Sequence, residues 1–263
     1  MSKARSSRRS FLTRALAGAG AVVLAGCDKL SQSKGFTDFL REAENLTRPV
    51  QRALAGSNAL APEYTKADIA PVFRANGTLH PNTNAYRTLA ANGFRDWRLV
   101  VDGLVETPLS LSLDELRAMP PRTQITRHDC VEGWSCIGEW TGAPLAHVLK
   151  LAGVKPRAKY VMFFCADPME GHDDPANPKG PFYYESLDLI EANHPQTILA
   201  YGMNGGPLPV KYGAPMRLRA ERQLGYKMAK YVMHIQLVDD FSRIRGGNGG
   251  YWEDKGYTWW AGI

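Results

Sequence analysis

This sequence has little net charge beyond its first residues, no long apolar run and no internal repeat. The 263 residues include 32 Lys and Arg against 26 Asp and Glu, but residues 1–26 hold five basic residues and no acidic one. The rest of the chain has 27 basic and 26 acidic residues, and this near-neutrality argues against nucleic-acid binding. The uncharged run at residues 15–26 is too short to span a bilayer comfortably. The sequence contains no internal repeat, which argues against a repeat architecture.

The first residues resemble an export signal. Arg8 and Arg9 precede Phe11 and Leu12, as in twin-arginine signals, and a short apolar run follows. The run ends in Leu-Ala-Gly-Cys, which resembles a lipoprotein processing box and would make Cys27 the lipidated first residue of the mature chain. We therefore expect a protein on the periplasmic side of a membrane, exported by the twin-arginine route and tethered through the Cys27 lipid. That route carries folded proteins, which favours a cofactor inserted before export.

Cysteine is also scarce, and its number is odd. After Cys27 the chain keeps Cys130, Cys136 and Cys165. In an oxidising compartment, at least one of these thiols is then free or held by a metal or cofactor. A disulfide between Cys136 and Cys165 is compatible with the numbers, but the sequence does not decide it.

The order of elements predicts an α+β domain with mixed sheets and short helices. Strands are expected at residues 97–101, 160–166, 216–219 and 231–238, and a helix at 143–153. Ser112 and Glu115 form a capping box that opens another short helix, which Pro120 ends. Short helices among strands, without regular βαβ alternation, favour the α+β class.

We expect four parts along the chain. Residues 1–26 are the signal, 27–60 a polar tether with a helix that Pro49 stops, 61–245 the main domain, and 246–263 an aromatic tail. The tail follows a glycine-rich turn and carries five Trp and Tyr residues. It either docks on its own domain or contacts a membrane partner.

Cys130 ends a strand-like run and enters a polar loop flanked by aromatic residues. A thiolate there can bind a soft metal or a substrate, and a buried structural thiol is the simpler alternative. His128 and Asp129 nearby also suggest a Cys–His catalytic pair or a zinc site. Adjacent strand residues point to opposite faces, and Cys130 lies further from Cys136 than the paired cysteines of zinc sites do, which argues against both.

Seven short motifs occur in an order that resembles the sulfite oxidase family of molybdopterin-dependent oxidoreductases. The resemblance is strongest to its bacterial periplasmic branch, which contains the catalytic subunit of a methionine sulfoxide reductase. It covers most of the mature chain. The motifs are Phe-Arg-Ala-Asn-Gly at 73–77, Trp-Arg-Leu-Val-Val-Asp-Gly at 97–103, Cys-Val-Glu-Gly-Trp-Ser at 130–135, Trp-Thr-Gly-Ala-Pro-Leu at 140–145, Met-Asn-Gly at 203–205 with Leu-Pro at 208–209, Tyr-Gly-Ala-Pro-Met-Arg-Leu at 212–218, and Gly-Tyr-Lys-Met-Ala-Lys at 225–230.

This resemblance implies a molybdenum–molybdopterin cofactor with Cys130 as the thiolate ligand of the metal. Arg217 matches a basic residue that grips the pterin phosphate, a role that suits a guanidinium fork. It further implies cofactor contacts from Asn76, Cys165, Tyr212, Met228, Ala229 and Lys230, of which Tyr212 stands where relatives often have His or Asn. His128 and Tyr184 are our candidates for a catalytic proton donor.

The residues after Cys130 bear on the substrate. Animal and plant-type sulfite oxidases place arginines there to form a cationic pocket, whereas this chain has Glu132, Gly133 and Trp134. A carboxylate and an indole disfavour sulfite, so a neutral oxo-donor fits better.

We therefore expect oxygen-atom transfer, in the direction that reduces a sulfoxide-type substrate. The chain has no Cys-x-x-Cys-His motif, so no haem is expected and electrons would come from a membrane or soluble cytochrome. The alternatives are a sulfite-type dehydrogenase working in the opposite direction and a non-catalytic lipoprotein that keeps the fold as a binding module.

Overall fold

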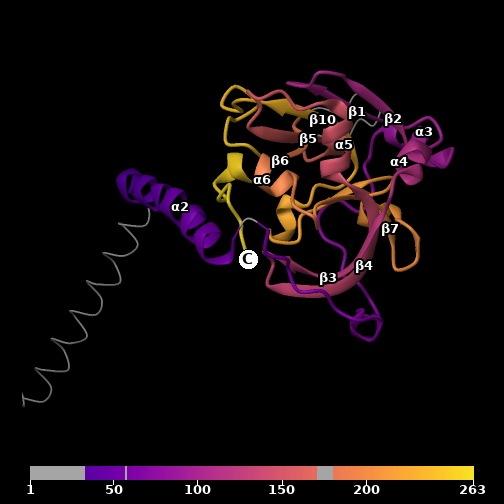
Figure 1. Cartoon of the computed structure of the whole chain (residues 1–263), viewed down its shortest axis with the longest axis horizontal. Coiled ribbons are helices and arrows are strands. Elements are labelled where there is room, and N and C mark those ends of the chain that lie inside the picture. Colours follow the sequence, from indigo (N-terminus) through magenta and orange to yellow (C-terminus); the bar gives the residue numbers. More distant parts are fainter. Residues whose placement is uncertain (1–32, 57, 171–179) are drawn as a thin grey trace, which may run out of the picture. The chain divides into compact units, whose positions relative to one another are not determined.

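The computed structural model describes residues 33–56, 58–170 and 180–263 (Figure 1). The chain divides into two compact units, Met1–Val50 and Gln51–Ile263, which are described separately here. The residues predicted to form an export signal, and Cys27, lie outside the described residues. Within the described ranges, no helix is both long enough and apolar enough to cross a membrane.

Helix α2 (Lys34–Ala55) continues through Pro49, so the predicted stop at this proline is wrong. A proline removes only its own N–H donor, and a helix can resume beyond it at an energetic cost. The helix ends instead at Gly56, which has a φ of +78° and donates its N–H to the carbonyl of Arg52 at 2.9 Å. A glycine in this left-handed conformation is a common helix end.

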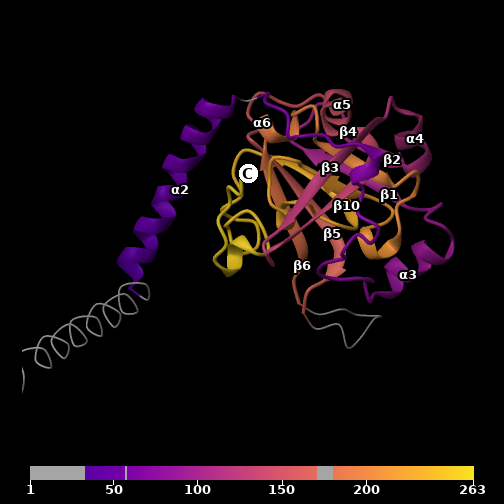
Figure 2. The ribbon, with the colours of Figure 1, turned by 90° about the horizontal axis from the view of Figure 1, so that it is seen from below.

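The second unit is built on two five-stranded sheets (Figures 1 and 2). The first sheet has the strand order β2-β1-β10-β5-β6, and of its neighbouring pairs only β1 and β10 run parallel. Its strands are β1 (Arg98–Gly103), β2 (Leu109–Ser112), β5 (Tyr160–Pro168), β6 (Phe182–Asp188) and β10 (Val232–Val238). The second sheet is antiparallel and has the strand order β3-β4-β7-β8, with β9 also paired to β7. Its strands are β3 (Arg122–Cys130), β4 (Trp134–Pro144), β7 (Ile198–Met203), β8 (Gly206–Pro207) and β9 (Arg217–Arg219).

The helices of this unit are short, which confirms the predicted α+β class. The expected capping box is present, with the Ser112 hydroxyl accepting from the Glu115 N–H at 3.1 Å where α4 begins. The helices and 3-10 turns are α3 (Asn84–Ala91), α4 (Leu113–Ala118), α5 (Leu145–Ala152), α6 (Leu189–Ala192), η1 (Lys66–Asp68), η2 (Val210–Tyr212), η3 (Gly225–Lys227) and η4 (Glu253–Lys255).

Alternating burial along β1 shows how the sequence pattern forms the core. Leu99 and Val101 are fully buried, while the residues between them face outward. Val148 and Leu149 of α5 belong to the same apolar cluster, together with the buried Trp97. Burial of a side chain of this size contributes roughly 2 kcal/mol, so this core supplies much of the stability.

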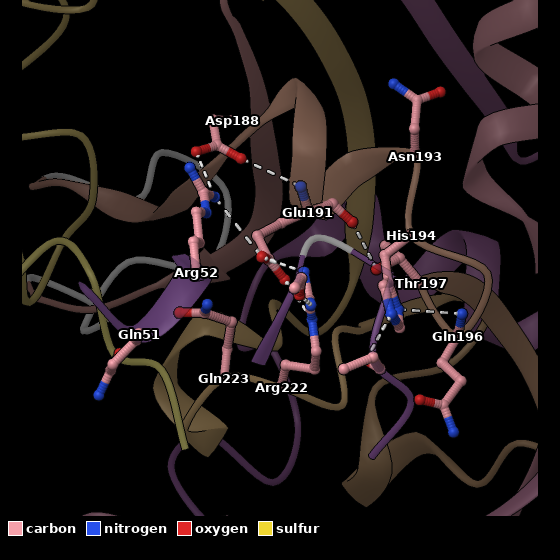
Figure 3. A network of polar contacts seen from close by, with 12 residues as sticks. Gln51, Arg52, Asp188, Glu191, Asn193, His194, Gln196, Thr197, Arg222 and Gln223 are labelled. Carbon is pink, nitrogen blue, oxygen red and sulfur yellow. Dashed lines mark hydrogen bonds and ion pairs between the residues drawn. The ribbon is translucent and has the colours of Figure 1, made fainter. Parts of the chain in front are cut away.

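A polar network holds the start of the second unit against α6 (Figure 3). Arg52 donates to Asp188 at 2.6 Å, and Arg222 donates to Glu191 at 2.5 Å. Burial raises the pKa of the Glu191 carboxyl, and the nearby Arg222 charge opposes that shift. Buried carboxylates of this kind need cationic partners, which the two arginines provide.

The aromatic tail docks on its own domain, as the first of the two alternatives predicts. Tyr251 is buried, and its N–H donates to the Tyr184 carbonyl of β6 at 3.0 Å. Trp259 donates to the Ser186 hydroxyl, also on β6, at 2.8 Å. Figure 2 shows the yellow C-terminal segment beside β6. We call residues 246–263 the C-terminal arm.

Gly142 tests the packing of β4 against β7. A Cβ at this position would meet the Leu199 carbonyl oxygen and lie 2.6 Å from the Ala200 Cα, both backbone atoms that cannot move aside. Gly142→Ala is therefore expected to lower the free energy of unfolding by about 3 kcal/mol in urea denaturation. Gly206→Ala is the matched control, because its nearest atom would be 3.9 Å away. Equal stability of the two variants would contradict this packing.

Candidate functional site

Cys130 lies at the wall of a cavity of about 180 Å³. Cys130 is the last residue of β3, which includes the strand-like run before it. Gly133, with a φ of +80°, allows the tight turn from β3 into β4. The cavity is lined by Asn76, Gly77, Thr78, Cys130, Val131, Glu132, Asp167, Met169, Tyr183, Arg217, Gly225, Tyr226, Met228, Lys230, Trp252 and Tyr257. The structure therefore brings five predicted site residues to one cavity, namely Asn76, Cys130, Arg217, Met228 and Lys230.

Two cations line this cavity without an ion pair to any carboxylate in the described residues. Buried Arg217 donates to the backbone carbonyls of Tyr212 at 3.1 Å and Met228 at 3.4 Å, and its Nε has no hydrogen-bond partner. Partly buried Lys230 donates to the carbonyls of Asn76, at 2.7 Å, and Thr78. Burial lowers the pKa of Arg217 to about 9 and that of Lys230 to about 7. An anionic ligand in the cavity would relieve this uncompensated charge.

Lys227, three residues before Lys230, is different. Its ammonium group is buried between Glu185 and Glu253, at 2.5 Å from the latter. These carboxylates hold the pKa of Lys227 above its usual range despite burial, whereas the pKa of Lys230 is lowered. Lys227 is therefore a structural lysine with its charge matched, whereas Lys230 pairs directly with no carboxylate among the described residues.

The Cys130 side chain has the features of a metal ligand rather than of an activated nucleophile. Its Sγ is 3.9 Å from the Asn76 Nδ2. Burial is the main cause that raises the pKa of the Cys130 thiol, and the Glu132 charge acts in the same direction. A catalytic thiolate needs the opposite shift, whereas a bound metal ion can deprotonate such a thiol itself.

His128 does not form a catalytic pair with Cys130. It is fully buried and does not line the cavity, and its Nδ1 is 3.0 Å from the Arg219 Nη1. Burial and the charges of Arg219 and Arg217 lower the pKa of His128 well below its ordinary value. Because the ring therefore stays neutral, the expectation that His128 donates the catalytic proton gains no support.

Four other predicted residues lie off the cavity wall. The Tyr184 hydroxyl donates to Asp254 at 2.5 Å, so this candidate proton donor faces the C-terminal arm. Tyr212 donates its hydroxyl to the Phe73 carbonyl at 2.6 Å and uses its own carbonyl to hold Arg217. Cys165 and Ala229 are buried and do not line the cavity. Tyr212 therefore supports the site through Arg217 rather than by facing the cavity.

The sequence reasoning missed Asp167, which lines the cavity. Its Oδ1 has no hydrogen-bond partner, and burial raises the pKa of its carboxyl to about 7 against the opposing charge of Lys230. Its position near the end of β5, where a long loop begins, was the available signal. Trp252 and Tyr257 were also missed as cavity residues, although the aromatic tail that contains them was noted.

The thiols of Cys130, Cys136 and Cys165 are free, so no disulfide joins Cys136 to Cys165. In the part of the chain that the structure describes, no group of three or more His, Cys, Asp or Glu side chains could hold a metal ion. The zinc alternative therefore gains no support from these residues.

Comparison with known proteins gives a family match over most of the second unit. The model of the family described as "Oxidoreductase molybdopterin binding domain" matches residues 87–244. A protein of Azospira oryzae, provisionally named protein-methionine-sulfoxide reductase subunit YedZ1, is 38% identical over 256 residues, which cover 97% of this chain and 88% of that protein.

More distant similarities cover smaller shares. The protein-methionine-sulfoxide reductase catalytic subunit MsrP of Xanthomonas campestris is 43% identical over 145 residues, 54% of this chain and 45% of that protein. The chain thus spans less than half the length of this relative. Among solved structures, the sulfane dehydrogenase SoxCD from Paracoccus pantotrophus has a TM-score of 0.49 at 25% identity, over 58% of this chain and 40% of that one.

Asp167→Asn is expected to flatten the pH dependence of stability in the cofactor-free protein. Because the folded-state pKa of Asp167 is raised to about 7, the folded protein binds this proton more tightly than the unfolded chain does. The contribution of Asp167 to stability should therefore fall as the pH rises from about 4 to about 7, and Asp167→Asn should remove this contribution. At about 1.4 kcal/mol per unit of pKa shift, the variant should be roughly 2–4 kcal/mol more stable at neutral pH.

Urea denaturation across this pH range checks the expectation. Asp114→Asn is the control, because the Asp114 side chain is 92% exposed, and this variant should keep the pH dependence of the unsubstituted protein. Parallel pH profiles for Asp167→Asn and the unsubstituted protein would contradict the assignment.

Proposed function

Because the chain belongs to the sulfite oxidase family of molybdopterin-binding oxidoreductases, we propose that it reduces a sulfoxide-type substrate by oxygen-atom transfer. It is an enzyme of that family, and the domain implies the molybdenum cofactor. One observation carries the proposal. The buried thiol of Cys130 lines the same cavity as Arg217 and Lys230, two cations with no direct ion pair to a carboxylate among the described residues.

The residues of the cavity fit the cofactor. The Nε of Arg217, which has no partner among the described residues, can donate to a phosphate oxygen, and the Lys230 ammonium, whose donors go to the carbonyls of Asn76, Thr78 and Lys211, adds positive charge to the same cavity wall. The Cys130 thiolate is a soft ligand of the kind that a sulfur-rich metal centre takes. The unpartnered Oδ1 of Asp167 can accept a hydrogen bond from an N–H donor of the pterin.

When bound, the cofactor supplies two-electron oxygen-atom transfer, and the chain supplies its positioning. Cys130 anchors the metal, and Asn76 lies beside its sulfur. Arg217 and Lys230 hold the anionic end, each oriented by backbone carbonyls of neighbouring segments. Side chains fixed in this way need little reorganisation when the cofactor binds.

A neutral oxo-donor suits this cavity better than sulfite. The Glu132 carboxylate lines the cavity and is about half exposed, Trp134 donates to it at 2.9 Å, and the Arg74 guanidinium lies 4.0 Å from it. Arg74 offsets part of this negative charge, and the remainder disfavours a sulfite anion and leaves a neutral sulfoxide unaffected. The names of the Azospira and Xanthomonas relatives, which refer to protein-methionine-sulfoxide reductase, support the same substrate class.

The reaction needs reducing equivalents that the chain does not itself provide. A sulfoxide, two electrons and two protons give a sulfide and water, and we propose that a membrane or soluble cytochrome delivers the electrons. The twin-arginine motif and the Leu-Ala-Gly-Cys box support export to the periplasmic side and a lipid anchor at Cys27.

Two assays on protein from a cofactor-competent host test the direction of the reaction. Methionine sulfoxide with a reduced dye should be turned over, and sulfite with an oxidised acceptor should not. Turnover in the sulfite assay alone would overturn the proposal in favour of a sulfite-type dehydrogenase.

Cys130→Ser is expected to remove bound molybdenum and to lower turnover by roughly a hundredfold or more, because a hydroxyl is a poor substitute for a thiolate at a soft site. Metal analysis per chain checks this directly. Cys136→Ser is the matched control, since Cys136 does not line the cavity, and it should keep its molybdenum. Full metal content in Cys130→Ser would show that another residue holds the metal.

A further inference from the structure

The C-terminal arm supplies two side chains to the cavity wall, Trp252 and Tyr257. Together with Tyr226 they form an aromatic cluster. The ring centroids of Tyr226 and Tyr257 are 5.2 Å apart, and those of Trp252 and Tyr257 are 5.3 Å apart. All three rings line the cavity that contains Cys130, so this apolar surface belongs to the site although the arm lies outside the family match at 87–244.

Exposure shows where the cavity opens. Among its lining residues, Val131 is 43% exposed and Tyr257 is 41% exposed, whereas Arg217 is fully buried. Gly77 and Glu132 of the lining are exposed as well, so the entrance is bordered by the segment around Gly77, by the turn that follows Cys130 and by the arm. It presents a methyl-rich side chain, an aromatic ring and the Glu132 carboxylate to an incoming molecule.

Buried contacts hold the arm in this place. Glu253, the neighbour of Trp252, pairs at 2.5 Å with Lys227, and both are buried. The Tyr226 hydroxyl donates to the Thr258 carbonyl at 2.7 Å, which ties the cluster to the arm on the other side of Tyr257. Trp252 and Tyr257 are thus fixed before a substrate arrives, and such preorganisation reduces the entropy cost of binding.

The chemistry of this entrance favours one class of substrate. Sulfur makes favourable contacts with aromatic rings at about 5 Å, and a methyl group packs well against them. The negative faces of the rings disfavour an oxyanion, and so does the Glu132 carboxylate, whose charge Arg74 at 4.0 Å offsets in part. A neutral sulfoxide with a methyl group on sulfur meets all of these conditions.

We propose that Trp252 and Tyr257 are specificity-determining residues, which hold the methyl-sulfinyl end of an aliphatic sulfoxide at the entrance of the Cys130 cavity. This inference rests on the proposed function, because it concerns the substrate of the same site. The two rings act in binding and take no part in electron or proton transfer.

Calorimetric binding of methionine sulfone, an unreactive analogue, to the holoenzyme tests the inference. Trp252→Leu and Tyr257→Leu should each weaken binding by roughly threefold to tenfold, which matches the usual strength of sulfur–aromatic contacts. The KM for methionine sulfoxide should rise by a similar factor with kcat within about twofold. Trp252→Phe, which keeps a ring, should restore most of the affinity.

Trp260→Leu is the matched control on the same arm. Trp260 lies against Arg52, with the guanidinium carbon 4.5 Å from its ring centre, and does not line the cavity. This variant should bind the sulfone as the unsubstituted enzyme does. Tyr257 is partly exposed, so Tyr257→Leu decides the question even if Trp252→Leu does not fold.

The possible failures are distinguishable. A molybdenum-loaded protein that turns over no sulfoxide would overturn the proposed function and this inference together. The inference alone would be overturned if the enzyme is active but Tyr257→Leu and Trp252→Phe leave the sulfone affinity and the KM unchanged. If Trp252→Leu folds, it would have to leave both quantities unchanged as well. A rise in KM that Trp260→Leu reproduces would also overturn it, because the effect would then come from loosening the arm.

Discussion

The charge of Arg217 and Lys230, which pairs directly with no carboxylate among the described residues, is the constraint on which the site depends. Transfer of a cation from water into a protein is costly unless a partner compensates it, and here the hydrogen-bond acceptors are backbone carbonyls. The lowered pKa values of both groups express that cost. A bound anion would remove it, and we propose that one binds at β9 and the segment after η3.

Other buried cations of the second unit show that the fold can match charge where no ligand is needed. Arg219, two residues from Arg217 on β9, pairs with Glu221 at 2.6 Å, and both side chains are fully buried. Lys227, three residues from Lys230, pairs with Glu185 and Glu253. The same short segments thus contain, side by side, one cation in a direct ion pair and one that pairs directly with no carboxylate among the described residues. The charge of Asp167, on the same cavity, opposes the lowering of the Lys230 pKa without reversing it.

Local sequence signals predicted a good part of this arrangement. The capping box at Ser112 and the apolar alternation of β1 and β10 depend on neighbouring residues, so they could be predicted. The motifs around Cys130, Arg217 and Lys230 marked one side of the cavity. The continuation of α2 through Pro49, the neutral state of His128 and the place of Asp167 and Trp252 depend on contacts between distant segments. The β7 strand, buried along its whole length, lacks the alternation that marks a half-buried strand.

The central claim is that Cys130 and the two unpaired cations bind one cofactor between them. A crystal structure of the loaded enzyme, with anomalous scattering measured at the molybdenum edge, tests it most directly. We predict a single strong anomalous peak at bonding distance from the Cys130 Sγ, with phosphate density against Arg217 and Lys230. A molybdenum peak at Cys165 or Cys136, or phosphate density away from both cations, would contradict the account.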